Sequence, residues 1–362
     1  MANTNSFISG FFKDLKVVEL ASVLAGPSAG MFFAELGAQV IKVENKKNGG
    51  DVTRNWRIPG ETKEGPSAYF SAINYGKKHS FLDLTEENDL NHCHELLADA
   101  DLVLSNYSNA IAEKLSVDAK TVRKLNSTVV FIQLNGFFNS DRPAYDVVLQ
   151  AETGWVSMTG TEAKPAKLPV ALIDILAGHQ IKEAALLGIV HKLRTGKGSY
   201  FEVNLEQVSL SSLANQATNY LMNDQVAEPI GTMHPNIAPY GDWFETADAA
   251  RFVLAIGSEK QFDAFAKIIG LEKTENFSSN TARLRNRELL VEKIWKKVSK
   301  WKYQDLADQM DQEKIPYGKI KSLDEVLSSE AVDDMLRIET QEGRKKKQLS
   351  GNGFTGRSFL PF

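Results

Sequence analysis

The 362-residue sequence has few of the features that mark secreted or membrane-spanning proteins. It contains one cysteine, Cys93, so no disulfide forms within the chain, which fits a reducing compartment. Its longest apolar stretches, such as residues 168–177, contain a proline or an acid and are too short to span a bilayer. Residues 1–7 are polar and lack the apolar run of a signal peptide. We therefore expect a cytoplasmic protein without a membrane partner.

An excess of positive charge is also missing. The sequence has 42 basic and 46 acidic residues and a net charge of −4, so no bulk cationic field is available to hold nucleic acid. A hydrophobic content of 43% and a charged content of 24% are ordinary for a globular protein. The balance excludes a nucleic-acid partner but is compatible with a local basic pocket for a phosphorylated ligand.

Short apolar runs alternate with helical periods between residues 15 and 204, which predicts an open α/β sheet with helices on both faces. Runs that favour strands lie at 17–20, 39–44, 101–104 and 128–132. A helical pattern between the first two runs predicts a βαβ unit with parallel strands. Thr85 is expected to cap a helix that runs through Leu97.

The pattern changes after this region. Residues 205–224 lack strong strand signals and are predicted to form a helical linker. Further on, paired strands are predicted at 243–246 and 251–256, and helices at 259–269 and 287–298. The predicted domains are therefore a large α/β domain at 1–204, the linker at 205–224, a smaller α+β domain at 225–315 and a C-terminal segment at 316–362.

The first predicted βα turn carries an incomplete dinucleotide-binding fingerprint. It has only Gly26 and Gly30, and Pro27 removes one backbone donor, although Glu44 stands where an acid binds an adenosine ribose. The pattern favours an ordinary turn with proline in the first turn of the helix. The alternative is a looser nucleotide pocket at the carboxyl ends of the strands.

Asp174 interrupts an apolar run, where an unpaired carboxylate is costly to bury. A helical pattern begins just after it, so we expect Asp174 at or near a helix N-terminus. Two roles fit this position. Asp174 is either an N-cap satisfied by backbone N–H groups or a desolvated nucleophile that the helix N-terminus keeps ionised. The pattern by itself does not decide between them.

Other polar residues are weaker candidates. Asn106 and Asn135 follow predicted strands and could offer amide contacts to an adenine or a pantetheine, although asparagine is also a common turn former. Lys46, Lys47 and Lys114 could supply charge to phosphates, although most lysines are simply solvated.

The sequence gives little support to a metal site or to a cysteine nucleophile. His92 and His94 flank Cys93, but residues two apart on a helix face apart, and no second ligand pair is evident, so we expect no metal. The basic run at 344–347 is predicted to be a solvated tail.

Taken in order along the chain, these motifs resemble those of the class III CoA-transferases, the family that includes formyl-CoA transferases and carnitine CoA-transferase. The resemblance extends from about residue 15 to the C-terminus. It rests on LAGP at 24–27, VIKVE at 40–44, GDVTR at 50–54, NYGKK at 74–78, LDL at 82–84, SNY at 105–107, YDVVLQA at 145–151, ALID at 171–174, TGKG at 195–198, HPN at 234–236 and PYG at 239–241.

The resemblance implies that Asp174 matches the family's catalytic aspartate. The expected activity is transfer of CoA between an acyl-CoA and a small carboxylic acid, through covalent intermediates on Asp174. Coenzyme A and acyl-CoA are then substrates, and neither a metal nor a permanently bound cofactor is expected.

The same matching implies a set of CoA contacts. They are Leu24, Ala25, Asn45, Leu82, Asp83, Leu84, Thr85, Asn106, Tyr107, Ser108, Lys114, Asn135, Gly136, Phe137 and Phe138. Asn45 stands where many relatives carry an arginine, and Lys46 and Lys47 are candidate substitutes. Lys114 replaces another frequent arginine, which keeps the charge but loses a bidentate phosphate contact.

The family fold implies a Rossmann-like open parallel sheet in the large domain, to which residues 316–362 return after the smaller α+β domain. It also implies a homodimer of two ring-like chains that interlock.

Three other functions are alternatives to transfer. The related α-methylacyl-CoA racemases typically carry a histidine before the aspartate matched by Asp146, and this sequence has Tyr145 there, which favours transfer. A CoA-binding protein without turnover is an alternative of another class, which the presence of Asp174 argues against. An NAD oxidoreductase is disfavoured by the incomplete glycine fingerprint. The acyl donor and the acceptor acid are not indicated by the sequence; succinate, formate, oxalate and carnitine-like acids all remain open.

Overall fold

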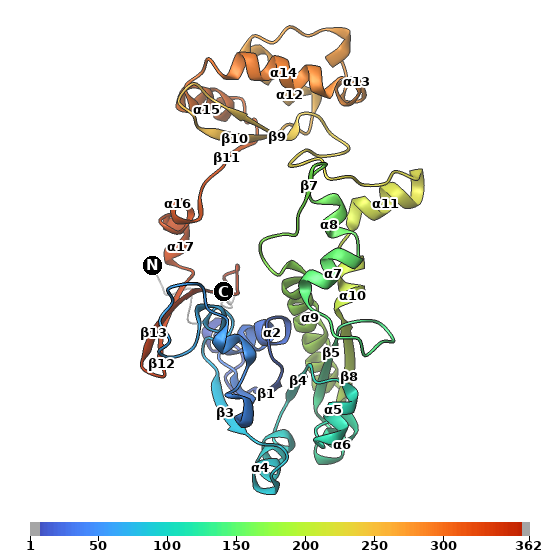
Figure 1. Ribbon diagram of the computed structural model, residues 1–362, viewed down its shortest axis with the longest axis vertical. Helices are drawn as coiled ribbons and strands as arrows, with labels where there is room; N and C mark the ends of the chain where they lie inside the picture. Colours follow the sequence, from blue (N-terminus) through green and yellow to red (C-terminus); the bar gives the residue numbers. More distant parts are fainter. Residues whose placement is uncertain (1–7, 357–362) are drawn as a thin grey trace, which may run out of the picture. The chain divides into compact units, whose positions relative to one another are not determined.

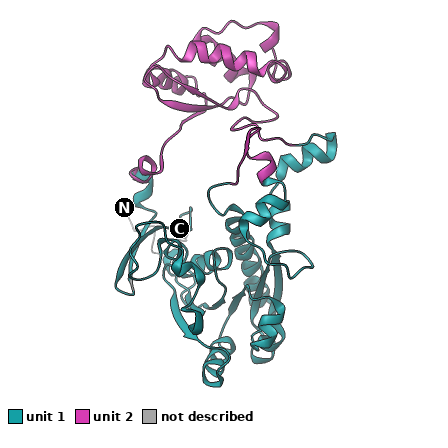
Figure 2. Cartoon of the chain, in the orientation of Figure 1, with its two compact units in different colours: residues 1–155, 168–226, 330–362 teal, residues 156–167, 227–329 magenta. Residues whose placement is uncertain are grey.

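The computed structural model describes residues 8–356, which form two compact units (Figure 1, Figure 2). Unit 1 contains the described residues up to Trp155, then Leu168–Val226, and then those from Glu330 onward. Unit 2 contains Val156–Lys167 and Ala227–Ser329. Unit 1 is therefore assembled from three separate stretches of chain. The domain boundaries predicted at 204, 224 and 315 stay predictions.

Unit 1 is built on a six-stranded sheet in which every neighbouring pair of strands is parallel. The strand order is β3-β2-β1-β4-β5-β8. Their bounds are β1 Lys16–Leu20, β2 Gln39–Asn45, β3 Lys78–Leu82, β4 Leu102–Ser105, β5 Val130–Asn135 and β8 Ser199–Asn204. The central strand β4 is buried along its whole length, as expected for a parallel sheet covered on both faces. The predicted open α/β sheet is confirmed.

Helices cover both faces of this sheet, because successive strand residues point to opposite sides. Val17 packs toward α2 (Ala25–Glu35), α9 (Leu172–Thr195) and α10 (Leu205–Ser211). Val18 packs toward α4 (Glu87–Ala98), α5 (Asn109–Lys114) and α6 (Ala119–Leu125). The remaining short elements of this part of unit 1 are η1 Lys46–Asn48, η2 Val52–Asn55, α3 Ala68–Ser71, α7 Asp146–Glu152 and α11 Ala214–Asn223.

The strand order reverses between β1 and β4, which are neighbours although two strands lie between them in the chain. In open α/β sheets this switch point leaves a crevice at the carboxyl ends of the strands, where ligands bind. The loops that border it here are the segments after Leu20 and after Ser105.

One helix start agrees with the sequence-based expectation, and one differs from it. α2 begins at Ala25, so Pro27 falls within its first turn, where its missing N–H is tolerated. α4 begins at Glu87 with Glu86 as its N-cap, so the prediction that Thr85 caps this helix is wrong. The Thr85 hydroxyl instead donates to Asp83 at 2.7 Å.

The C-terminal part of unit 1 is a hairpin of β12 (Leu336–Gln341) and β13 (Arg344–Leu349), preceded by α17 (Glu330–Asp333). The basic run at 344–347 was predicted to be a solvated tail, and this is wrong for alternate residues. The Lys346 side chain is buried and pairs with Glu339 at 2.9 Å, and Arg344 pairs with Glu61 at 3.0 Å. Alternation along β13 turns these two side chains inward and leaves their neighbours exposed.

Unit 2 is an α+β unit around a three-stranded antiparallel sheet in the order β11-β10-β9. The predicted strand pair and the helices predicted at 259–269 and 287–298 are confirmed. Its elements are β6 Gly160–Thr161, β7 Lys164–Pro165, β9 Tyr240–Glu245, β10 Arg251–Ala255, α12 Glu259–Ile269, η3 Glu275–Phe277, α13 Asn280–Arg285, α14 Arg287–Val298, α15 Tyr303–Gln312, β11 Tyr317–Lys319 and α16 Leu323–Leu327, while α8 (Trp155–Met158) begins at the last residue of the preceding stretch of unit 1.

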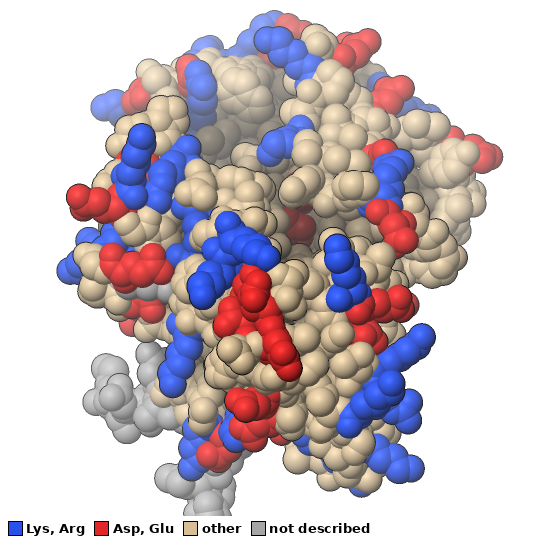
Figure 3. All heavy atoms as spheres, turned by 60° about the horizontal axis from the view of Figure 1, so that its bottom comes forward, with Lys and Arg blue, Asp and Glu red and all other residues tan. Residues whose placement is uncertain are grey.

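The surface carries charges of both signs. On the face drawn in Figure 3, Lys and Arg side chains lie interspersed with Asp and Glu side chains. Within residues 8–356, none of the helices is long and apolar enough to cross a bilayer.

Candidate active site

Asp174 lies in the first turn of α9, as predicted, but it is not the N-cap of that helix. The N-cap is Ala171, whose side chain makes no capping hydrogen bond. Asp174 is 7% exposed, and within residues 8–356 its carboxylate has no hydrogen-bond partner. Burial, followed by the charge of Asp146, raises the pKa of Asp174 to about 7. The raised pKa differs from one of the two roles left open by the sequence, in which the helix N-terminus keeps the carboxylate ionised.

Asp146 supplies the cap that Asp174 does not. It is the first residue of α7, and its Oδ1 accepts the Ile173 N–H of α9 at 2.7 Å. Its Oδ2 accepts a hydrogen bond from Gln150 Nε2 at 2.5 Å. Two carboxylates thus lie close together, one with hydrogen bonds to both oxygens and one with none. Of the two roles that the sequence left open for Asp174, the capping role therefore belongs to another residue, Asp146.

Aromatic side chains lie beside the two carboxylates. The Tyr69 phenol is within electrostatic range of both, since burial and the charges of Asp174 and Asp146 raise the pKa of Tyr69 to about 12. The Trp56 ring packs edge-on against Tyr69, with 5.1 Å between ring centroids, and lies 6.5 Å from the ring of Tyr145. Neither Trp56 nor Tyr69 was predicted from the sequence to belong to the site.

A close approach between α2 and α9 places Asp174 at the carboxyl edge of the sheet. A Cβ atom on Gly178 would stand 2.1 Å from the Ser28 Oγ and 3.2 Å from the Ala25 carbonyl oxygen. Glycine therefore allows α9 to lie directly on the N-terminal turn of α2, which follows β1. Asp174 is one helical turn before Gly178, so it lies near the switch-point crevice.

Five of the predicted CoA contacts border that crevice. Leu24 and Ala25 begin α2 directly after β1, and Asn106, Tyr107 and Ser108 follow β4. The Asn106 side chain bonds both backbone groups of Ser22, accepting from its N–H at 3.1 Å and donating to its carbonyl at 2.9 Å. Asn106 therefore ties the two loops of the crevice together.

The contacts predicted at Asn45 and 82–85 also meet, because β2 and β3 are parallel neighbours and Asn45 pairs with Leu82. The Lys47 ammonium bonds Asp83 at 2.8 Å and the Thr85 hydroxyl at 2.7 Å. This ammonium holds the pKa of the Asp83 carboxyl well below its usual range. Lys47 is thus neutralised by Asp83, while Lys46 has no ion pair within the described part of the chain.

Residues 135–138 lie at the end of β5, and Asn135, Phe137 and Phe138, but not Gly136, line a cavity of ≈ 190 Å³. Asn135 Nδ2 donates to Glu202 at 3.3 Å, and the Phe138 N–H donates to Glu206 at 2.9 Å. Lys114, in contrast, is exposed at the end of α5 and forms no ion pair with any residue from 8 to 356. It does not line this cavity.

A buried ion network beneath the first βα turn was not anticipated. Glu19 on β1 bonds Lys42 on β2 at 2.9 Å and Lys77 at 2.8 Å. Lys42 also bonds Asp51 at 3.0 Å. Although burial opposes ionisation, the two ammonium groups hold the pKa of Glu19 below its usual value. The signal in the sequence was a pair of opposite charges, Glu19 and Lys42, within two otherwise apolar predicted strands. In the parallel register these two residues are neighbours.

The network sets the conformation of the turn that leads to Leu24. Asp51 accepts the Val23 N–H at 3.2 Å, and Val23 has a φ of 72°, which a β-branched residue rarely adopts. Lys77 donates to the Pro27 carbonyl at 2.7 Å. Buried charged side chains therefore fix the loop after β1, which borders the crevice.

Glu44 had been weighed as a ribose ligand, and its contacts argue otherwise. Both of its oxygens bond the Arg54 guanidinium at 2.7 Å, and one also bonds His79 at 2.7 Å. Glu44 is 3% exposed, so it fixes β2 against the segment that contains Arg54.

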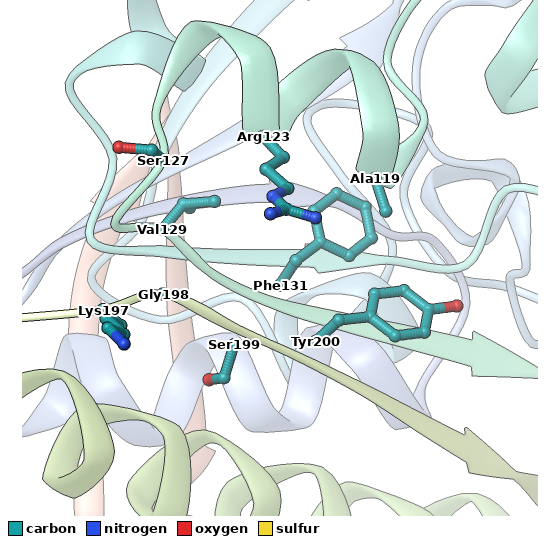
Figure 4. A pocket seen from close by; sticks show the side chains of 9 residues that line it. All are labelled: Ala119, Arg123, Ser127, Val129, Phe131, Lys197, Gly198, Ser199 and Tyr200. Carbon is teal, nitrogen blue, oxygen red and sulfur yellow. The ribbon is translucent and has the colours of Figure 1, made fainter. Parts of the chain in front are cut away.

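A larger cavity of ≈ 380 Å³ lies between α6 and the beginnings of β5 and β8. Figure 4 shows the Arg123 guanidinium beside the Phe131 ring, with Tyr200 nearby. None of its lining residues is among the predicted contacts. No cluster of three or more His, Cys, Asp or Glu side chains within residues 8–356 is arranged to hold a metal ion.

A doubly wound sheet with a buried carboxylate beside its switch point defines a nucleotide-type binding fold with an acidic group at its ligand crevice. A family model described as CoA-transferase family III matches residues 12–354. The chain belongs to this family and is a CoA-transferase.

Individual relatives agree with that membership. A succinate–glutarate CoA-transferase from Agrobacterium fabrum is 33% identical, over 94% of this chain and 87% of its own length. A human succinyl-CoA:glutarate CoA-transferase is 29% identical, over 88% of this chain and 73% of its own. The crystal structure of a CAIB/BAIF family protein from Brucella suis superposes with a TM-score of 0.80 at 32% identity, and covers 93% of this chain and 90% of that one.

Proposed function

We propose that this protein moves CoA between an acyl-CoA and a small dicarboxylic acid, with Asp174 as the covalent nucleophile. The observation that carries the proposal is the state of Asp174, which is buried, accepts no hydrogen bond from the described residues 8–356 and lies near the crevice where CoA is expected. A carboxylate in this state is both reactive and accessible to a thioester delivered along that crevice.

The proposed reaction has four balanced steps. The Asp174 carboxylate attacks the thioester carbonyl, forming a mixed anhydride and releasing the CoA thiolate. The thiolate attacks the aspartyl carbonyl, giving an aspartyl-CoA thioester and the first free acid. The incoming carboxylate attacks this thioester and again displaces the thiolate. The thiolate then attacks the acyl carbonyl of the new anhydride, which yields the new acyl-CoA and the Asp174 carboxylate.

The surroundings of Asp174 suit these steps. Each attack develops an oxyanion, and the first-turn N–H groups of α2, which is packed against α9 at Gly178, are the candidate donors. The raised pKa of Asp174 makes its carboxylate more basic than one in water. The Tyr69 phenol remains protonated at neutral pH and can donate a hydrogen bond to an acid bound beside Asp174.

The class of acid is proposed from the relatives. The names of several pair succinate or succinyl-CoA with glutarate, mesaconate or D-citramalate, and another pairs acetyl-CoA with oxalate. Succinate and all four of these partner acids are small dicarboxylic acids. We therefore choose succinyl-CoA and glutarate as the first donor and acceptor.

Oxygen transfer tests this chemistry. Glutarate labelled with ¹⁸O in its carboxylates should leave one labelled oxygen on Asp174 after a turnover, because the final step cleaves the anhydride on the acyl side. Peptide mass spectrometry locates the label, and Asp174→Asn should show neither label nor turnover. Turnover by Asp174→Asn, or turnover of the wild type without label on Asp174, would rule out the proposed nucleophile.

We further propose that the chain works as a homodimer. What supports this is the outer face of unit 1, where β8 is an edge strand and the neighbouring α9 exposes Leu187 to 63% and Leu193 to 81%. Light scattering should give twice the mass of one chain. The interlocking implied by the resemblance predicts that tagged and untagged dimers do not exchange subunits until they are unfolded, and rapid exchange would contradict it.

A further inference from the structure

We propose that Asp146 is a positioning residue for this reaction: it caps α9 from the neighbouring helix α7, so that the Asp174 carboxylate stays free to attack. The inference rests on the proposed function, in which Asp174 is the nucleophile.

The N-cap residue of α9 provides no side-chain acceptor for the N–H groups at the start of the helix. The first N–H groups of a helix have no partners within the helix and are satisfied by capping side chains. In α9 the N-cap is Ala171, which cannot serve. The Ile173 N–H donates to Asp146 instead, at 2.7 Å. Asp174 is the next residue and is the carboxylate on α9 itself that would otherwise be drawn to this N-terminus.

Asp146 is itself held in place by a hydrogen bond. Gln150, one turn further along α7 and fully buried, donates to Asp146 Oδ2 at 2.5 Å. The other end of the same amide, Gln150 Oε1, accepts the Leu168 N–H at 2.9 Å. Two side chains of α7 therefore hold the segment that leads to Asp174 at both of its ends, Leu168 and Ile173. A segment held in this way keeps the nucleophile within the tolerance that covalent catalysis requires.

The charge of Asp146 also affects the pKa of Asp174. Among the described residues, two titratable groups interact with Asp174: Asp146 from α7 and the Tyr69 phenol from α3. After burial, the charge of Asp146 is the remaining cause that raises the pKa of Asp174. The Tyr69 phenol has a raised pKa of about 12 and stays neutral in the working range. Removing the charge of Asp146 should therefore lower the pKa of Asp174.

The structure offers a variant that moves this charge and keeps every hydrogen bond. In Asp146→Asn with Gln150→Glu, the asparagine oxygen still accepts the Ile173 N–H, and its amide donates to the new carboxylate. That carboxylate still accepts the Leu168 N–H. The negative charge is then one residue further from Asp174 in the hydrogen-bonded chain. Asp146→Ala is the contrasting variant, because it removes the cap together with the charge.

The experiment measures kcat and KM for succinyl-CoA with glutarate as a function of pH. For Asp146→Ala we expect kcat to fall by about tenfold or more with little change in KM, because the uncapped Ile173 N–H draws Asp174 out of its reactive position. The double variant should recover most of that lost kcat. Its acid limb in kcat/KM should lie about half a pH unit or more below that of the wild type, which we expect near pH 7.

The outcomes separate the two proposals. If Asp174→Asn is inactive while Asp146→Ala keeps the kcat of the wild type, Asp146 does not position the nucleophile and the proposed function stands. The positioning role also fails if the double variant recovers no activity or if its acid limb does not move. If Asp174→Asn turns over, the proposed function itself fails. Circular dichroism and thermal unfolding of each variant exclude misfolding as the cause of a loss.

Discussion

Replacing Asp174 with asparagine tests the electrostatics of the site through stability rather than activity. The ordinary pKa of an aspartate is 3.8, and burial together with Asp146 raises it to about 7 in the folded protein. Between these two pH values the folded state binds more protons than the unfolded state. The free energy of unfolding of the wild type therefore falls as the pH rises through this window.

The size of the effect follows from the shift. One pKa unit corresponds to about 1.4 kcal/mol, so a shift of about 3 units removes about 4 kcal/mol of stability once the pH exceeds 7. Below about pH 4, Asp174 is protonated in both the folded and the unfolded state, so it removes no stability. Asparagine does not ionise, so Asp174→Asn escapes the loss. Its buried amide without a partner costs about 1–3 kcal/mol, but equally at every pH.

The assay is urea unfolding followed by tryptophan fluorescence, at a fixed protein concentration and at several pH values from about 4 to about 8.5. The difference in free energy between Asp174→Asn and the wild type should grow in favour of the variant by about 4 kcal/mol across this range. Glu64→Gln, which changes an exposed carboxylate, should give a difference that stays flat. A flat curve for Asp174→Asn as well would mean that the carboxylate is not desolvated, and the account of its reactivity would fail.

Two further predictions concern the packing beneath the site. Gly178→Ala should destabilise the fold by about 1–3 kcal/mol and lower kcat, because its Cβ would stand 2.1 Å from the Ser28 Oγ; adding Ser28→Ala should restore part of both in urea unfolding and kinetics. Glu19→Gln should lower the free energy of unfolding by about 3–5 kcal/mol in urea, because Lys42 and Lys77 would lose the buried carboxylate that they share. A decrease below about 1 kcal/mol would indicate that water replaces this carboxylate.

The sequence predicted the central strands of the sheet and missed its edges for a physical reason. β1, β2 and β4 are buried on both faces and therefore read as apolar, β-branched runs. β3 and β8 are the two edge strands, and their sequences KHSFL and SYFEVN mix polar and apolar residues because less of each strand is buried. Neither was predicted as a strand from its residues.

At the site, the sequence located Asp174 but could not assign its partner. An acid within an apolar run is visible by inspection, whereas Asp146 meets Ile173 across 27 positions and through a backbone N–H, which leaves no residue pattern. The buried pair of Glu19 and Lys42 was within reach, because each lies in a predicted strand and the two are opposite neighbours in the parallel register. Pairing the predicted strands would have been needed to find it.

The division of labour between Asp146 and Asp174 makes the kinetic and stability experiments depend on one another. A carboxylate that caps a helix is stabilised by that role and is a poorer nucleophile, so one residue cannot do both well. The charge of Asp146 enters both experiments through the same pKa of Asp174. If moving this charge lowers the acid limb of kcat/KM by about half a unit, the gain in stability from Asp174→Asn in that background must shrink by about 0.7 kcal/mol. If the acid limb of kcat/KM moves and the stability difference does not change with it, the limb reports the titration of a group other than Asp174.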